Sequence, residues 1–201
     1  YVCNACGASS SKWAGQCDSC GEWNTISEEK PLTSSSSSKA IGAKRGGRVT
    51  LTALDTHETP PPRTKSLLSE LDRVLGGGLV PSSAILVGGD PGIGKSTLLL
   101  QALAHMSANR NVLYVSGEES AQQVALRAKR LVLNVEAVHL FAEIQLERIQ
   151  VVLKERKPDI AVIDSIQTVY SEVLQSAPGS VAQVRECAAQ LTRMAKASGT
   201  C

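Results

Sequence analysis

The sequence of 201 residues has few aromatic side chains, no long apolar run and no marked excess of charge of either sign. Aromatic residues make up 3% of it, which leaves little material for a broad platform on which nucleic-acid bases could stack. No stretch approaches the roughly 20 apolar residues that span a bilayer, so the sequence does not fit an integral membrane protein. The net charge of +2 gives no bulk electrostatic reason to expect nucleic acid, although a local basic patch is compatible with it. Residues 1–7 show no secretory signal.

The composition divides the chain into three segments. Residues 1–27 hold four of the six cysteines and both tryptophans. Residues 28–62 contain a serine run at 34–38 and three consecutive prolines at 60–62. This segment has too little apolar surface to offset its ordering entropy, so we interpret it as a mostly flexible tether with one short strand expected at residues 49–52. Residues 63–201 form the third segment, which is periodic.

Buried strands alternate with amphipathic helices in the third segment. Continuous apolar runs predict strands at residues 84–87, 112–116, 137–140 and 160–163. Helical spacing of apolar residues predicts helices at residues 95–107, 121–130, 144–156 and 181–197, the third ended by Pro158. This alternation is typical of an α/β fold in which helices cover both faces of a parallel sheet.

Four cysteines near the amino terminus have the spacing of metal ligands. They form two Cys-x-x-Cys pairs separated by ten residues, with glycines at 7 and 21 that relieve the tight turns: Cys3, Cys6, Cys17 and Cys20. Two intervening residues let both sulfurs of a pair bind one tetrahedral ion, and four thiolates leave no open position for catalysis. A unit of this size cannot build a sufficient core alone, so we expect a structural zinc ion to stabilise it.

Two other uses of the cysteines are weighed against zinc. Two disulfides suit a secreted domain, and a redox-active Cys-x-x-Cys needs only one pair. The missing secretory signal and the nucleotide motif described next disfavour the first, and the paired spacing disfavours the second. Cys187 lies on a predicted helix and is interpreted as a small buried apolar residue, whereas Cys201 supports no assignment.

A complete phosphate-binding loop of the form G-x-x-x-x-G-K-[ST] lies between the first predicted strand and the first predicted helix. Its backbone amides are expected to converge on the phosphates of ATP at the positive end of the helix, with Lys95 on the β and γ phosphates and Ser96 on Mg²⁺. The predicted nucleotide-binding residues are Gly89, Asp90, Pro91, Gly92, Ile93, Gly94, Lys95, Ser96 and Thr97.

Carboxylates at the ends of two other predicted strands complete the candidate site. Asp164 ends an apolar strand, which is the usual Walker B arrangement, and is expected to hold Mg²⁺ through water. Glu118 follows the strand at 112–116 and is the better candidate for the base that activates water. Glu119 could serve instead or could favour the start of the next helix, and both glutamates could simply belong to that helix start.

The chain resembles the RadA (Sms) DNA-repair family, a bacterial and plastid branch of the RecA-like ATPases. The resemblance is carried by CNACGASSSKWAGQCDSCGEWNT, by LLSELDRVLGGGLVPSSAILVGGDPGIGKSTLLLQ and by YVSGEES with VIDSIQTVYS and APGSVAQVRE. It covers nearly all of the chain outside the serine-rich segment. It implies a zinc module at residues 1–27, a linker at 28–62 and a RecA-like ATPase domain at 63–201.

The resemblance also implies a function. Family members are DNA-dependent ATPases of recombinational repair that bind single-stranded and branched DNA, act with a RecA-type recombinase, promote branch migration and assemble as homo-oligomeric rings. Glu118 falls where RecA-like enzymes keep their water-activating glutamate. Tyr170 and Arg185 fall where relatives place DNA-facing loops, but a buried tyrosine and a solvated arginine fit them equally well. The basic group Arg127, Lys129 and Arg130 is more typical of a solvated helix face than of a DNA groove. A cytoplasmic location in a bacterium, or a plastid one in a plant, is implied.

The sequence departs from the family after Cys201, where the relatives continue into a strand that lies between the Walker B strand and the strand before the phosphate loop. We therefore expect an ATPase core that is incomplete at its carboxyl end, a chain that is a fragment, and poor hydrolysis of ATP by it alone. Two further functions stay open: a RecA/KaiC-like signalling ATPase or kinase, and a zinc-dependent adaptor with a nucleotide-responsive docking surface.

Overall fold

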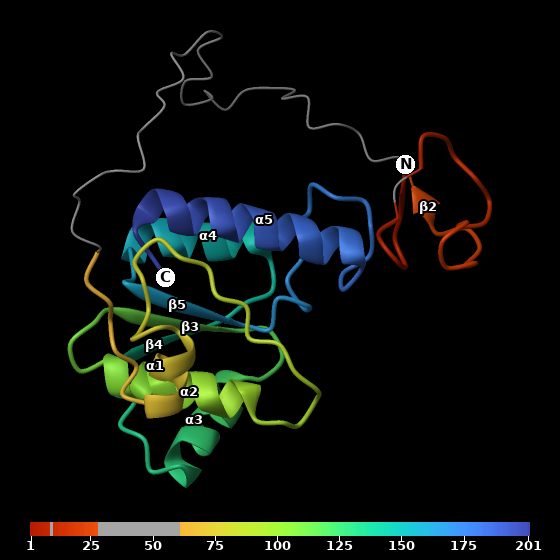
Figure 1. Cartoon of the computed structure of the whole chain (residues 1–201). Helices are drawn as coiled ribbons and strands as arrows, with labels where there is room; N and C mark the ends of the chain where they lie inside the picture. The colour runs from red at the N-terminus through yellow and green to blue at the C-terminus, as the bar shows by residue number, and fades with distance from the viewer. Residues whose placement is uncertain (9, 28–60) are drawn as a thin grey trace, which may run out of the picture.

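The computed structural model describes residues 1–8, 10–27 and 61–201, which form a small amino-terminal module and a larger α/β unit (Figure 1). The strand expected at residues 49–52 lies outside the described residues, as does all of the expected tether except Pro61 and Pro62. Within the described residues, no helix is both long and apolar enough to cross a membrane.

The amino-terminal module is closed by a pair of very short strands. β1 (Val2–Cys3) and β2 (Ile26–Ser27) pair antiparallel and bring the two ends of the module together. Its core consists of Cys3, Cys17 and Ile26, with two alanines packed against them. Trp13 and Trp23 are 60% and 66% exposed, so the largest side chains of the module add little to this core. A core of this size leaves the folding of the module dependent on a bound metal.

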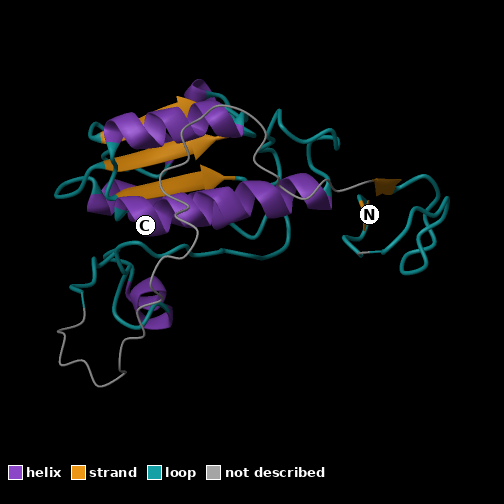
Figure 2. Ribbon diagram, turned by 90° about the horizontal axis from the view of Figure 1, so that it is seen from above, coloured by secondary structure: helices purple, strands orange, loops and turns teal. Residues whose placement is uncertain are grey.

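Three parallel strands form the sheet of the larger unit, in the order β4-β3-β5 (Figure 2). They are β3 (Val112–Ser116), β4 (Val138–Ala142) and β5 (Ile160–Asp164). β3 lies in the centre, and its register with β5 runs from Val112 opposite Ile160 to Ser116 opposite Asp164. The strands predicted at 112–116, 137–140 and 160–163 are therefore present: the first has the predicted bounds, the second is shifted at both ends and the third is one residue longer.

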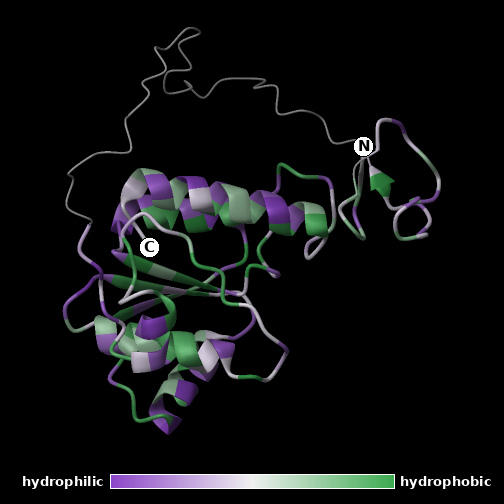
Figure 3. Ribbon diagram, viewed as in Figure 1, coloured by the Kyte–Doolittle hydropathy of each residue, from purple (hydrophilic) through white to green (hydrophobic). Residues whose placement is uncertain are grey.

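Helices cover both faces of this sheet (Figures 1 and 3). α2 (Lys95–Met106) and α3 (Ala121–Arg130) pack on one face with Val112 and Tyr114, and α4 (Leu146–Arg156) and α5 (Val181–Ser198) pack on the other with Leu113 and Val115. Successive residues of a strand point to opposite faces, so a continuous apolar strand supplies both cores. The predicted α/β fold class is confirmed.

Local signals fix the ends of these helices. Ser120 caps α3 in a capping box with Gln123, and Ser180 caps α5, which ends at a left-handed Gly199. α4 ends at a left-handed Lys157, directly before Pro158. One short helix, α1 (Ser69–Val74), is not predicted by the sequence pattern because it has six residues and no side-chain cap.

The prediction of a buried strand at residues 84–87 is wrong in this structure. These residues form no strand, and Ile85 and Leu86 are 42% and 86% exposed. The reason is the lack of a neighbouring strand within the described residues. β5 pairs with β3 along one edge, and on its other edge Cys201 alone exchanges backbone hydrogen bonds with Asp159 and Ala161, at 2.9 and 2.8 Å. Two residues before Cys201, the carbonyl of Gly199 accepts a hydrogen bond from the amide of Ser82.

Cys201 thus pairs with β5 in the pattern of a parallel ladder, beside the place where residues 82–83 pass. This is where the resemblance to RecA-like enzymes implies that the intervening strand begins. An apolar run becomes a buried strand only when backbone partners and a covering layer are present, and the part of the chain that the structure describes gives residues 84–87 neither.

A matched pair of leucine truncations tests this description. Leu103 is fully buried on α2, whereas Leu86 is 86% exposed. We expect Leu103→Ala to lower the free energy of unfolding by about 2–5 kcal/mol, because it opens a cavity in the core. Leu86→Ala should change it by less than about 0.5 kcal/mol. Urea unfolding followed by circular dichroism measures both, and equal losses would contradict the exposure of Leu86.

Candidate functional site

The four predicted cysteine ligands lie together. All four sulfur atoms are within 4.8 Å of one another, and the Sγ–Sγ distances are 3.7 Å for Cys3 with Cys20 and 3.7 Å for Cys6 with Cys17. A tetrahedral zinc ion with Zn–S bonds of about 2.3 Å places its sulfurs about 3.8 Å apart, so this donor set fits zinc. The amides of Gly7 and Gly21 donate to the carbonyls of Cys3 and Cys17, which shapes each Cys-x-x-Cys turn.

The pKa values of Cys3 and Cys20 indicate that all four thiols can be deprotonated together near neutral pH only around a bound cation. A hydrogen bond with the Thr25 hydroxyl lowers the pKa of Cys3 to about 6. The Glu22 amide favours the thiolate of Cys20, yet burial and the three neighbouring thiols together raise the pKa of Cys20 to about 12. The first thiolate therefore forms readily and the last only at high pH unless a cation offsets their repulsion.

The phosphate-binding loop leads into α2 with glycines at the positions that its backbone needs. Gly92 and Gly94 have φ angles of 79° and 101°, in the left-handed region, and a Cβ atom at either position would meet no heavy atom within 4 Å. The backbone conformation, not space, therefore demands glycine here. The Lys95 ammonium donates to the carbonyls of Gly89 and Asp90, at 2.7 and 2.8 Å, and so lies folded over the loop.

The amides of this loop are available to an anion. In the part of the chain that the structure describes, no backbone hydrogen bond engages the N–H groups of five residues at the loop and helix start: Gly92, Gly94, Lys95, Ser96 and Thr97. The loop is exposed up to Gly94. Unpaired amides at the start of a 12-residue helix are the usual anion site of this motif.

Two of the predicted carboxylate residues, Glu118 and Asp164, lie on neighbouring segments at the carboxyl edge of the sheet. The register places Ser116 opposite Asp164, and the amide of Gly117 donates to the Asp164 carbonyl at 2.8 Å. In the residues that follow Gly117 and Asp164, the Ser165 hydroxyl donates to Glu118 Oε1 at 2.5 Å. A Cβ atom at Gly117 would lie 2.1 Å from Thr168 Oγ1, so only glycine fits at this crossing. Within the described residues, no hydrogen bond or ion pair joins the phosphate loop to this carboxylate pair.

The two glutamates after β3 have different surroundings. Glu118 is exposed, and the only side chain bonded to it in the described structure is Ser165. Glu119 forms an ion pair with Arg127, and its amide and carbonyl are both bonded to the Ser116 hydroxyl. Neither glutamate belongs to α3, which begins after the Ser120 cap. Of the two, Glu118 has the more exposed carboxylate and forms no ion pair among the described residues.

Arg127 differs from the surface residue that the sequence pattern indicates. Lys129 and Arg130 are exposed, but the Arg127 side chain is only 11% exposed and its guanidinium lies beside Tyr114. Burial lowers the pKa of Arg127, but Glu119 and Tyr114 together outweigh burial and keep the pKa above its ordinary value. The sequence signal for it is its position on the side of α3 that carries the buried Val124 and Ala128, and this signal is too weak to interpret without the structure.

The two residues considered for DNA contact have different surroundings. Tyr170 is half-buried and its backbone pairs with Gln145. Arg185 is exposed on α5 and forms no ion pair with any described residue. No hydrogen bond joins the two side chains within the described residues, although Ser171 next to Tyr170 bonds to Gln183 on α5.

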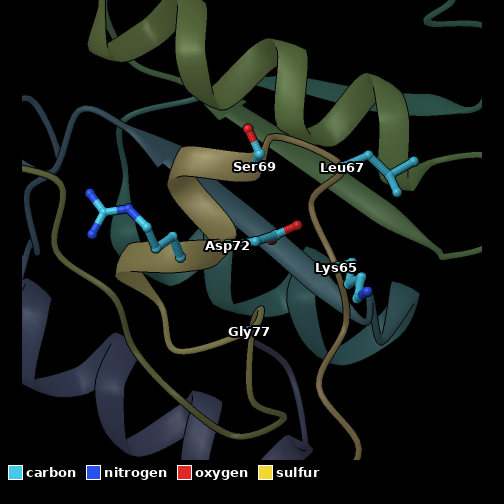
Figure 4. A pocket seen from close by; sticks show the side chains of 6 residues that line it. Lys65, Leu67, Ser69, Asp72 and Gly77 are labelled. Carbon is cyan, nitrogen blue, oxygen red and sulfur yellow. The ribbon is translucent and has the colours of Figure 1, made fainter.

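A shallow hollow lies beside α1, away from these groups (Figure 4). Leu67 and Lys65 come from the segment before the helix, and Asp72 points back toward that segment, where it accepts hydrogen bonds from the amide and hydroxyl of Ser66. No residue of the phosphate loop lines this hollow. Its geometry is explained by the anchoring of the segment that enters the α/β unit.

Comparison with known families follows the same division of the chain. Residues 1–28 match the rubredoxin metal binding domain, and residues 50–201 match the AAA domain. The chain belongs to the AAA-domain family. The match begins before the described α/β unit and includes the phosphate loop and both edge carboxylates of this AAA domain.

Curated relatives confirm the resemblance to the RadA family. The chain is 51% identical over 201 residues to the DNA repair protein RadA of Haemophilus influenzae, covering 98% of this chain and 43% of that protein. It is 50% identical to RadA of Pseudomonas aeruginosa and 47% identical to RadA of Bacillus subtilis, covering 100% and 99% of this chain and 44% of each relative. The chain, with its metal module and AAA domain, therefore spans less than half the length of these relatives.

The metal module makes a prediction about zinc content. Purified chain should hold one zinc ion per molecule, and Cys17→Ser should lose it, because a tetrahedral thiolate site does not tolerate the loss of a buried ligand. Cys187→Ser is the matched control, since Cys187 lies on α5 outside the cluster. Metal analysis after gel filtration measures both, and full zinc retention by the Cys17 variant would contradict the four-cysteine site.

Proposed function

We propose that this chain is the zinc-module and nucleotide-binding part of a DNA-dependent ATPase of recombinational DNA repair, which promotes branch migration on single-stranded and branched DNA with a RecA-type recombinase. The observation that carries the proposal is the phosphate loop with unpaired amides at the start of α2, in an AAA domain whose relatives are DNA repair proteins. The domain limits proposed are 1–27, 28–62 and 63–201.

ATP binds through the loop in this proposal. The amides of Gly92, Gly94, Lys95, Ser96 and Thr97, unpaired among the described residues, bind the phosphates, and the positive end of the α2 dipole favours their negative charge. The Lys95 ammonium leaves the carbonyls of Gly89 and Asp90, on which it rests in the structure, and binds the β and γ phosphates. Support comes from the exposure of the loop, which leaves this movement unobstructed.

Ser96 and Asp164 are the residues proposed for Mg²⁺, Ser96 through its hydroxyl and Asp164 through water. Their oxygen atoms are the donors that Mg²⁺ prefers, and it would offset charge on the β and γ phosphates. Glu118 accepts a proton from the attacking water in this scheme. Its exposed carboxylate beside Ser165, one residue past the strand end, supports this role over Glu119, which is engaged by Arg127.

Hydrolysis by the 201-residue chain alone is proposed to be slow. Residues 84–87, which lead into the loop, have no strand partner within the described residues, and no hydrogen bond or ion pair among those residues ties the loop to Glu118 or Asp164. Catalysis depends on positions held to fractions of an ångström, so a loosely supported loop binds ATP better than it turns ATP over.

The remaining features of the proposal concern the whole protein. It assembles as a homo-oligomeric ring in the bacterial cytoplasm or in a plastid, and DNA lies against the segment from Tyr170 to Arg185. The exposed Arg185, without an ion pair among the described residues, is the side chain best suited to a phosphate.

The nucleotide site makes a prediction about binding by this chain. We expect Lys95→Ala to weaken the binding of ATP with Mg²⁺ by about 10- to 100-fold, because a charged hydrogen-bond donor to phosphate is lost. Lys154→Ala, which removes an exposed lysine of α4, should leave the affinity within about twofold. Titration with a fluorescent ATP analogue measures both, and equal affinities would refute the site.

The function is tested in a longer protein that contains this chain and has the full length of its relatives. We expect single-stranded DNA to raise its ATP turnover, and Glu118→Gln to lower turnover by about 10²- to 10⁴-fold with ATP affinity preserved, because the base is lost and the loop is not. Glu119→Gln should lower ATP turnover by less than about tenfold.

Phosphate release with and without DNA is the measurement. Autophosphorylation without DNA stimulation would favour the signalling ATPase or kinase, and neither response would favour the zinc-dependent adaptor.

A further inference from the structure

A phenol hydroxyl reaches the carboxylate that ends β5. Tyr114 is the central residue of β3, fully buried, and lies opposite Val162 in the register. Asp164 is two residues beyond Val162, so Tyr114 and Asp164 face the same side of the sheet, toward α2 and α3. The Tyr114 hydroxyl donates a hydrogen bond to Asp164 Oδ2. Among the described residues, no other side chain donates to this carboxylate, which leaves Oδ1 without a protein donor.

The Tyr114 hydroxyl has a second charged neighbour in Arg127. Burial raises the pKa of Tyr114 well above its usual range, the Asp164 carboxylate adds to the rise and the Arg127 guanidinium opposes it. Tyr114 therefore stays protonated and remains a donor throughout the neutral range. One guanidinium nitrogen of Arg127, Nη1, is buried without a partner within the described residues, while the group as a whole pairs with Glu119.

Arg127 is held in place by the segment that joins β3 to α3. The Ser116 hydroxyl bonds to both the amide and the carbonyl of Glu119, at 3.1 and 2.6 Å. The capping box of Ser120 and Gln123 then fixes the first turn of the helix that carries Arg127. A chain of contacts thus runs from the end of β3 through Glu119 and Arg127 to Tyr114 and on to Asp164.

We propose that Tyr114 and Arg127 are positioning residues that hold the Asp164 carboxylate in one orientation, with Oδ2 occupied and Oδ1 free for a water bound to Mg²⁺. The proposal rests on the function proposed above, in which Asp164 holds Mg²⁺ through water. The χ2 torsion of an aspartate, which rotates its carboxylate, has only a weak intrinsic preference. A hydrogen-bond donor fixed at one oxygen therefore sets the orientation of the carboxylate.

A purely structural role for the hydroxyl makes a different prediction. Any buried phenol needs an acceptor, and Asp164 could simply supply one. In that case the removal of the hydroxyl would change folding stability without a specific effect on metal-dependent binding. Measuring nucleotide affinity with and without Mg²⁺ distinguishes this structural role from the positioning role.

The test is the affinity of the 201-residue chain for a fluorescent ATP analogue, with saturating Mg²⁺ and again with EDTA. The ratio of the two affinities reports the contribution of the metal site. We expect Tyr114→Phe, which keeps the ring volume, to lower this ratio by about 5- to 10-fold and to leave the affinity in EDTA within about twofold. Arg127→Met should also lower this ratio. Tyr1→Phe is the matched control, since it removes an exposed phenol of the metal module.

A double-mutant cycle with Asp164→Ala decides whether the effect passes through this carboxylate. In the Asp164→Ala background, Tyr114→Phe should change the ratio by less than about twofold. An equal loss in both backgrounds, or an unchanged ratio in Tyr114→Phe, overturns the positioning role and leaves ATP binding standing. Failure of the unsubstituted chain to bind the analogue overturns the proposed function itself. Thermal unfolding of each variant confirms that the affinities belong to folded protein.

Discussion

The pairing of β3 with β5 is the constraint on which the rest of the α/β unit depends. Five residues of each strand run parallel in one register, which ends with Ser116 opposite Asp164. This register brings the segment with Glu118 beside the one with Ser165, and it puts Tyr114 on the same face as Asp164. A slip of one residue would turn Asp164 to the opposite face of the sheet, toward α4 and α5. The backbone ladder, more than any single side chain, creates the candidate site.

The two units of the chain are stabilised in different ways. The α/β unit buries side chains on both faces of its sheet, so its stability comes from packing. The metal module has a core of Cys3, Cys17 and Ile26 and leaves both tryptophans largely exposed. Two of its core residues are themselves metal ligands, so metal loss removes the core along with the crosslink.

Local patterns in the sequence predicted those features that depend on neighbouring residues. The bounds of β3 and α3 agree with their predictions, because an apolar run and a Ser120 cap are readable without tertiary contacts. The cysteine cluster was predictable for the same reason, since the ligands are close in sequence and their spacing restricts the geometry. The bonding that distinguishes Glu118 from Glu119 was not, because Ser165 and Arg127 lie far along the chain or on another element.

Features that depend on distant partners were missed or wrong. Residues 84–87 have the composition of a buried strand, yet burial requires a neighbour that residue composition does not report. Arg127 has the appearance of a solvated residue in an amphipathic helix, and only the fold reveals that its guanidinium lies beside Tyr114. The contact between Tyr114 and Asp164 joins residues 50 positions apart in sequence, which no periodicity predicts.

The exposed segment before the phosphate loop has a consequence for the behaviour of the polypeptide in concentrated solution. Ile85 and Leu86 present exposed apolar side chains, and among the described residues their backbone groups are unpaired and the outer edge of β5 is bonded to Cys201 alone. Such a surface accepts an extended strand from another molecule as readily as from its own chain. Self-association should therefore start at this edge, and solubility should depend on it more than on the net charge of the protein.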